Sequence, residues 1–260
     1  MKNSGFFENL GRRTIEFFDA VYELSRLFIQ TVKNIPSAWF YRRQIFEQFY
    51  NFLANTLPLA SVIAVFIGLG AMIQGQYQSV PLVPRIYSIN VIFKSTILVL
   101  GPIILSLVLA GKLGASLAAE LGSMKISDQV DALETLSLDP VGFLVLPRVL
   151  AGVIMLPVIT IYANLIALFS MFFASSVLSD WISPFEFIKG LEMNFRPFEL
   201  YLGNLIKPGV YGFIISLLGS FFGLRTHGGA LGVGRSATSA VVVSAILIVF
   251  FDYYLGRMLL

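Results

Sequence analysis

The segment Gly229–Ser236, GALGVGRS, comes close to a known chemical motif. Its spacing follows the phosphate-binding loop G-x-x-x-x-G-K-[ST], with Arg235 in place of the lysine. That loop binds phosphate when a strand precedes it and a helix N-terminus follows it in a soluble α/β domain. Here apolar runs of membrane-helix length stand on both sides. We therefore expect a tight glycine turn that binds no nucleotide, with Ser236 or Thr238 near the cap of the last helix.

Other residue types that support catalysis are scarce. The chain has no cysteine, and its one histidine, His227, lies beside the glycine turn as an expected solvated loop side chain. These counts predict no thiol nucleophile, no metal site and no catalytic residue. A membrane-embedded enzyme is disfavoured, because no cluster of His, Asp or Glu supplies acid–base partners. We expect the chain to bind no cofactor of its own.

The segment 111–140 concentrates charge in an apolar chain. Charged residues make up 13% of the sequence, yet seven of them fall in this stretch. Ser127 or Asp128 can cap a short helix, which Asp139-Pro140 ends. One side of that helix is apolar and contains Val130, Leu133 and Leu136. So short a helix is marginal alone, and the pattern fits either a helix on its own protein's surface or a docking element for a partner.

Two charged residues, Lys207 and Asp252, fall inside long apolar runs. A lysine at the centre of a membrane helix costs roughly 2.5–3.5 kcal/mol on insertion scales, whereas one near a helix end snorkels to the interface. Lys207 therefore either snorkels or faces an internal cavity, where an anionic headgroup would compensate its charge. Asp252 is expected to face another helix or the outer interface, and no role is assigned to it.

The composition predicts an integral membrane protein. Hydrophobic residues make up 57% of the 260 positions, above the roughly 45–50% of soluble domains. A hydrocarbon core about 30 Å thick needs roughly 20 apolar residues per crossing helix. The stretches that qualify are 55–73, 91–111, 149–179, 201–224 and 236–258. We expect an all-α polytopic membrane protein whose residues 55–260 form a domain of five transmembrane helices.

Prolines and glycines predict bent, closely packed spans. Helix-breaking residues lie in or near the first four spans, at Pro58, Pro102, Pro157 and Pro208. Small residues that let helices approach closely lie in the first and fourth spans, at Gly68, Gly70, Gly219 and Gly223. Structural packing is the expected role of both sets.

Residues 1–54 are expected to precede the spans as interfacial helices. Apolar side chains recur at near-helical spacing, with charged residues between them, at Phe7, Leu10, Phe17, Val21, Leu24, Phe28 and Val32. An amphipathic helix of this kind lies in the membrane interface, although a soluble cytoplasmic helix is the alternative. Pro36 ends the helix, and the aromatic and basic residues of 39–43 supply headgroup anchors.

The lysines and arginines indicate the orientation. If the N-terminus is inside, the segments 1–54, 112–148 and 225–235 are cytoplasmic and hold twelve of the eighteen basic residues. The positive-inside rule then predicts a cytoplasmic N-terminus and a periplasmic C-terminus. Because the basic residues are dispersed, we expect no nucleic-acid partner.

Most of the chain past residue 40 carries a family pattern. The segments are YRRQIFEQFYNFLANTLPLASVIAVFIGLGAMIQGQ at 41–76, GASLAAELGSMKISDQVDALETLSLDPVGFLVLPRVLAG at 114–152, and LIKPGVYGFIISLLGSFFG and GGALGVGRSATSAVVVSAILIVFFD within 205–252. They resemble the MlaE-type permeases, membrane subunits of ABC transporters that work with substrate-binding MCE-domain proteins. The resemblance implies a homodimeric permease in the bacterial inner membrane, with lipid as cargo and two copies of a separate ATPase that binds ATP and Mg.

The resemblance also gives the charged segment a role. In the family, the part that resembles 120–140 is a coupling helix that enters a groove of the ATPase, and its exposed apolar side would meet that subunit. The residues expected to couple to the ATPase are Glu120, Lys125, Asp128, Val130, Asp131, Leu133, Glu134 and Leu136.

A lipid site is implied in the same way. The family has a lysine that matches Lys207 near its lipid pocket, and many members have an Arg-Glu pair where this chain has Leu98-Val99. Gly68 and Gly70 would widen a central cavity near the dimer axis. The expected lipid-binding residues are Lys207, Gly68, Gly70, Leu98 and Val99, and without the pair either Lys207 is the main cation there or the substrate differs.

A secondary transporter or channel driven by an ion gradient is the alternative from another class. The charged insert argues against it, as does the small number of acidic residues within the spans.

Overall fold

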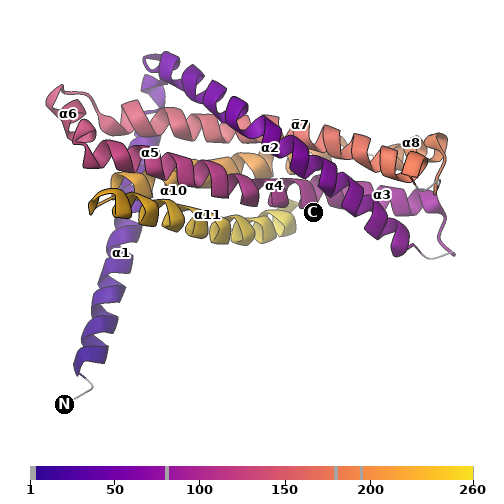
Figure 1. The fold of residues 1–260 in the computed structure, drawn as a ribbon, viewed down its shortest axis with the longest axis horizontal. Helices are drawn as coiled ribbons and strands as arrows, with labels where there is room; N and C mark the ends of the chain where they lie inside the picture. Colours follow the sequence, from indigo (N-terminus) through magenta and orange to yellow (C-terminus); the bar gives the residue numbers. More distant parts are fainter. Residues whose placement is uncertain (1–3, 80–81, 179–180, 194–195, 260) are drawn as a thin grey trace.

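The computed structural model describes residues 4–79, 82–178, 181–193 and 196–259 (Figure 1). Within these ranges the chain forms helices and their connections, and no β-strand. Five helical runs are long and apolar enough to cross a membrane: Arg42–Tyr77, Arg85–Ile126, Val141–Val177, Pro197–Leu224 and Gly229–Met258. The predicted all-α polytopic fold is confirmed.

The element order shows how these runs are built. The α-helices are α1 (Ser4–Lys33), α2 (Arg42–Tyr77), α3 (Arg85–Ser95), α4 (Gly101–Leu109), α5 (Ala115–Ile126), α6 (Gln129–Thr135), α7 (Leu146–Phe173), α8 (Pro184–Glu192), α9 (Pro197–Tyr201), α10 (Lys207–Leu224) and α11 (Gly229–Leu259). A 3₁₀ turn, η1 (Ile35–Trp39), follows α1, and five π-helical turns lie within the long runs: η2 (Thr96–Leu100), η3 (Ala110–Gly114), η4 (Val141–Val145), η5 (Ala174–Leu178) and η6 (Leu202–Ile206).

The long runs lie side by side along the long axis of the molecule (Figure 1). The helix α7 is the centre of the bundle, packed against α2 on one side and α10 on another, and α10 also contacts α5 and α11. In the most apolar stretch of the third run, 72% of the residues are buried, whereas in the corresponding stretch of α11 only 17% are buried. The third run therefore forms the core, whereas α11 presents most of its apolar surface outward.

Glycines permit the closest helix contacts. A Cβ on Gly152 of α7 would collide with the backbone oxygen of Gly212 on α10, and a Cβ on Gly68 of α2 would collide with that of Ala167 on α7. The predicted packing role of Gly68 is confirmed. Gly68 is buried against α7 within one chain, and its expected role in widening a central cavity near the dimer axis stays a prediction. Gly70 is exposed with open space beside it.

Three π turns come just before a proline. The turns η2, η4 and η6 precede Pro102, Pro147 and Pro208, each of which lies in the first turn of the next α-helix. A proline has no N–H to donate and its ring clashes with the carbonyl four residues earlier, so the backbone widens locally while the helix continues. Pro58 and Pro157, by contrast, lie inside continuous α-helices.

The helix α1 runs across the bundle and extends away from it (Figure 1). Its C-terminal half is attached by Leu27, which is buried against Val149 and Phe221, and by an edge-to-face contact of Phe28 with Phe213. This crossing arrangement is the one expected of an interfacial helix. The helix α2 is continuous from Arg42 to Tyr77, so the domain division predicted at residue 54 falls within a helix.

The charged segment differs from its expected form. The second run does not end near residue 111 but continues to Ile126, because Leu117, Ala118 and Leu121 of α5 pack between α10 and α11. The short helix α6 follows and ends at Thr135, four residues before Asp139. Its N-cap residue, Asp128, has a left-handed backbone with φ 57°, and its side chain makes no capping hydrogen bond. The prediction that Asp128 caps this helix through its side chain is therefore wrong.

The glycine segment is helical rather than a turn. The chain turns at residues 225–228, where Gly228 and Gly229 have φ values of 85° and 69°, and α11 begins at Gly229. Ser236 and Thr238 therefore lie inside α11 and do not cap it. His227 is exposed in the turn, as expected.

Candidate functional site

Ion pairs hold the charged segment in place. Arg148 of α7 is buried and donates to the Glu120 carboxylate of α5 at 2.6 Å and to the Leu144 carbonyl at 2.6 Å. Lys125 at the end of α5 donates to Asp131 of α6 at 2.6 Å. The Lys125–Asp131 pair therefore connects α6 to the second long run, and the Glu120–Arg148 pair connects that run to the third.

The apolar side of α6 faces its own protein. Val130 is 5% exposed and packs with Leu121 and Leu144, and Leu133 is half-buried against the same cluster. The expectation that Val130 and Leu133 form an exposed docking side is therefore wrong. Leu136 is 70% exposed. The exposed residues of α6 and its ends include Asp128, Asp131, Glu134 and Leu136, together with Gln129, Ala132 and Thr135.

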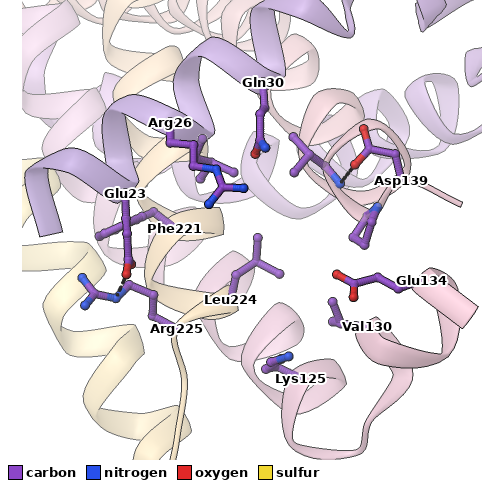
Figure 2. Close-up of a pocket in the computed structure, with 13 residues that line it drawn as sticks. Glu23, Arg26, Gln30, Lys125, Val130, Glu134, Asp139, Phe221, Leu224 and Arg225 are labelled. Atoms are coloured by element: carbon purple, nitrogen blue, oxygen red, sulfur yellow. Dashed lines mark hydrogen bonds and ion pairs between the residues drawn. The ribbon is translucent and has the colours of Figure 1, made fainter. Parts of the chain in front are cut away.

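A pocket of about 360 Å³ lies between α6, α1 and the end of α10. Figure 2 shows Arg26 and Gln30 extending from α1 and Glu134 from α6 into the space between them. At the edge of the pocket Glu23 pairs with Arg225 at 3.0 Å. Close by, Asn34 donates to Asp139 at 2.5 Å. Segments far apart in the sequence, at 23–34, 125–141 and 221–225, thus meet at one end of the bundle.

Lys207, the lysine of the predicted lipid site, lies deep in the bundle. Its side chain is 3% exposed and its ammonium donates to Asp252 of α11 at 2.9 Å. The Tyr211 hydroxyl donates to the same carboxylate oxygen at 2.6 Å. Snorkelling of Lys207 is therefore excluded, and the lysine contacts a carboxylate instead of facing an open cavity. The expectation that Asp252 faces another helix is confirmed. Sequence reasoning assigned it no role and missed its pairing with Lys207, although opposite charges within apolar runs commonly pair.

A backbone carbonyl completes this contact. Lys207 also donates to the Leu98 carbonyl at 3.1 Å. Pro102, four residues after Leu98, cannot give that carbonyl the i→i+4 hydrogen bond of an α-helix, and the ammonium donates to it. The structure thus brings together Lys207 and the backbone of Leu98, while Val99 is 37% exposed.

The family comparison identifies the chain. The family model described as Permease MlaE matches residues 45–258, which is most of the sequence. The chain belongs to the MlaE permease family. The matched residues include all of the five membrane-length helices except their outermost ends, together with the charged segment between the second and third of them.

Two relatives of this MlaE-family chain are named as ABC transporter permeases, and a third is a plant protein with a different name. A probable ABC transporter permease protein of Rickettsia felis is 33% identical over 96% of this chain and 96% of its own length. One of Synechocystis is 34% identical over 83% of this chain and 81% of its own. The Arabidopsis thaliana protein named Trigalactosyldiacylglycerol 1, chloroplastic, is 39% identical over 60% of this chain and 44% of its own. The chain is thus a permease of the ABC transporter class.

Contacts in two regions hold the long helices together. The contacts at α6 connect an outward polar surface to the second and third long helices. The contacts at Lys207 tie α10, α11 and η2 together in the bundle interior. Both arrangements hold helices against one another.

Proposed function

We propose that this chain moves phospholipid or a related lipid between a membrane and an MCE-domain partner, driven by a separate ATPase that binds ATP and Mg. Membership of the MlaE family supports this function. The Arabidopsis relative supports a lipid cargo, since its name contains that of a galactolipid. A second copy of the chain would complete the permease, because α2 and α11 present apolar surfaces that a homodimer can cover.

The observation that carries the proposal is the way α6 is fixed. A partner that pushes on α6 acts on α5 through Lys125–Asp131, and on α7 through Glu120–Arg148. An isolated helix of seven residues would be too unstable to transmit such a push. Because the apolar side of α6 is already buried on its own chain, the ATPase would contact the exposed residues Asp131, Glu134 and Leu136.

We place this end of the bundle in the cytoplasm of a bacterial cell and the bundle in its inner membrane. The N-terminal helix, the α5–α6 segment and the turn before α11 come together here. The segments that contain them hold twelve of the eighteen basic residues, which favours the cytoplasmic side. The C-terminus would then face the periplasm, after five crossings.

The lipid-contact part of the proposal changes with the structure. Lys207 is already compensated by Asp252, so an anionic headgroup could reach it only after this pair opens. Leu98 acts through its backbone carbonyl rather than its side chain. Gly70 and Val99 are exposed and would contact lipid only where a second copy encloses them.

Two variants of the outward surface test the docking of the ATPase. Glu134→Arg and Leu136→Arg each place a new charge where we propose that the ATPase binds. A charge buried without a partner at an interface typically costs about 2–5 kcal/mol, so co-purification of the ATPase should fall severely while the permease stays in the membrane. Glu192→Arg is the matched control, because Glu192 is exposed on α8 at the opposite end of the bundle.

Binding of the ATPase is measured by its stoichiometry after affinity purification in mild detergent, and transport by transfer of lipid to the MCE-domain partner. Normal stoichiometry and transport in both α6 variants would refute α6 as the docking element. Lipid transfer without any ATPase would instead favour the ion-gradient alternative.

A further inference from the structure

An apolar pocket of about 530 Å³ lies at the other end of the bundle, away from α6. It opens on the side of the molecule between α7, η6 and the α3–η2 segment. Its lining residues are Phe93, Ile97, Ile161, Asn164, Leu165, Leu168, Pro197, Leu200, Tyr201, Asn204 and Leu205. Two of the walls belong to π turns, since Ile97 is in η2 and Leu205 in η6.

The walls have the chemistry of a hydrocarbon site. Three of the side chains from α7, those of Ile161, Leu165 and Leu168, are aliphatic and belong to the third membrane-length run. The volume is within the range of small-molecule sites, about 300–1,000 Å³. A pocket with such walls, open to the side of a membrane helix, faces lipid tails rather than water.

The inner wall carries one polar pair. Asn164 of α7 is buried and donates to the Asn204 side chain at 2.6 Å, and Asn204 donates to the Leu200 carbonyl at 3.1 Å. The Asn164 oxygen lies so close to Gly101 that a Cβ there would collide with it. The amide pair therefore separates the pocket from the packed interior next to α4.

The rim of the pocket carries charge. Lys94, one residue after the lining residue Phe93, pairs with Glu199 at 2.8 Å. Arg196 is exposed next to Pro197, and it shares an adjoining small pocket with Lys94 and Glu199. An apolar pocket with two cations and one carboxylate at its edge matches an amphiphile that has a hydrocarbon tail and an anionic head.

We propose that this pocket binds one acyl chain of a membrane phospholipid, with the phosphate of the headgroup at Arg196 and Lys94. The site lies on the outer side of α7, η2 and η6, far along the chain from the coupling segment at α6. Its physiological use rests on the proposed lipid-transport function, but binding itself does not. The charged rim favours a lipid over a partner helix, because an apolar helix face offers nothing to the exposed Arg196 guanidinium.

A photo-crosslinking experiment tests the acyl-chain site. The whole permease is reconstituted in nanodiscs with a phospholipid that carries a diazirine in its acyl chain, and the adducts are mapped by mass spectrometry. Leu165→Trp fills the pocket, and Ile154→Trp is the matched control on the same helix. Leu165 and Ile154 are 53% and 45% exposed, so neither change should disturb the core.

The expected result is strong labelling of the segments around Ile97 and Leu200, reduced about tenfold by Leu165→Trp and unchanged by Ile154→Trp. Labelling of these segments no stronger than that of outward α11 residues would overturn the proposal. So would equal labelling in both variants. Protection of the pocket by a second protein chain would show that a helix occupies it.

The headgroup contact is tested separately with Arg196→Glu. Labelling by an anionic lipid, phosphatidylglycerol, should fall about tenfold relative to zwitterionic phosphatidylcholine, since an attraction becomes a repulsion. An unchanged ratio would refute the contact with Arg196. If the pocket is labelled but the protein transfers no lipid, the acyl-chain site is supported and the transport function is refuted. If the protein transfers lipid but the pocket is not labelled, the transport function is supported and the acyl-chain site is refuted.

Discussion

Two ion pairs of the same chemical kind lie in opposite surroundings. Lys125–Asp131, between α5 and α6, joins its atoms at 2.6 Å with side chains 29% and 53% exposed. Lys207–Asp252, between α10 and α11, joins them at 2.9 Å with side chains 3% and 15% exposed. The shorter pair is thus the one in contact with water.

The comparison shows that the surroundings matter more than the distance. Water and salt screen the exposed pair, and such pairs contribute about 0–1 kcal/mol. The buried pair is screened far less, and removal of one partner leaves a charge that nothing solvates. We therefore expect the pair at α6 to orient a surface and the pair at Lys207 to hold the bundle together.

The largest effect is expected from breaking the buried pair. Asp252→Leu leaves Lys207 buried without its carboxylate, and the free energy of unfolding should fall by about 3–5 kcal/mol. Unfolding by SDS in mixed micelles measures the change. The double variant Lys207→Met/Asp252→Leu should recover most of the loss, since replacement of a whole buried pair by apolar residues is often neutral.

The double variant also sharpens the comparison. It leaves the Leu98 carbonyl and the Tyr211 hydroxyl without the partners they have now, so we expect a residual loss of about 1–3 kcal/mol. A double variant as unstable as Asp252→Leu alone would show that the charge balance is not what stabilises this region.

An intermediate effect is expected at Glu120. Glu120→Ala removes the carboxylate partner of buried Arg148, which keeps its hydrogen bond to the Leu144 carbonyl. We expect a loss of about 1.5–3 kcal/mol, the range of hydrogen bonds to charged groups. The same SDS titration measures it, with Glu192→Ala as an exposed control. A loss as small as the control's would mean that water replaces Glu120 at no cost.

The smallest effect is expected at Lys125. Lys125→Ala should lower the free energy of unfolding by about 0–1 kcal/mol, because the pair is exposed. Raising the salt concentration to about 1 M should remove this difference, since the Debye length falls to about 3 Å. The loss in Asp252→Leu should persist at the same salt. If salt reduces the loss in Lys125→Ala and the loss in Asp252→Leu equally, burial does not explain how the two ion pairs differ in their contribution to stability.

Sequence patterns predicted the transmembrane helices well, because a helix that crosses the membrane needs a long run of apolar residues and such runs are visible in the sequence. The patterns gave α6 the wrong exposure, since the periodicity of Val130 and Leu133 shows that a side is apolar but not which chain covers it. They missed the continuation into α5 because Leu117 and Leu121 stand among small and charged residues that read as a loop. They also missed Asp252 as the partner of Lys207, because a pairing across 45 positions requires the packing of α10 on α11.

The second long run, Arg85–Ile126, reaches from the apolar pocket to the base of α6 as one helix. Its 42 residues correspond to about 63 Å, roughly twice the hydrocarbon thickness. The π turns at Thr96–Leu100 and Ala110–Gly114 divide this length into three stiff pieces. A π turn closes wider i→i+5 hydrogen-bonded rings than the i→i+4 rings of an α-helix. The helix therefore carries two wide turns along its length, one beside the apolar pocket and one at the start of α5.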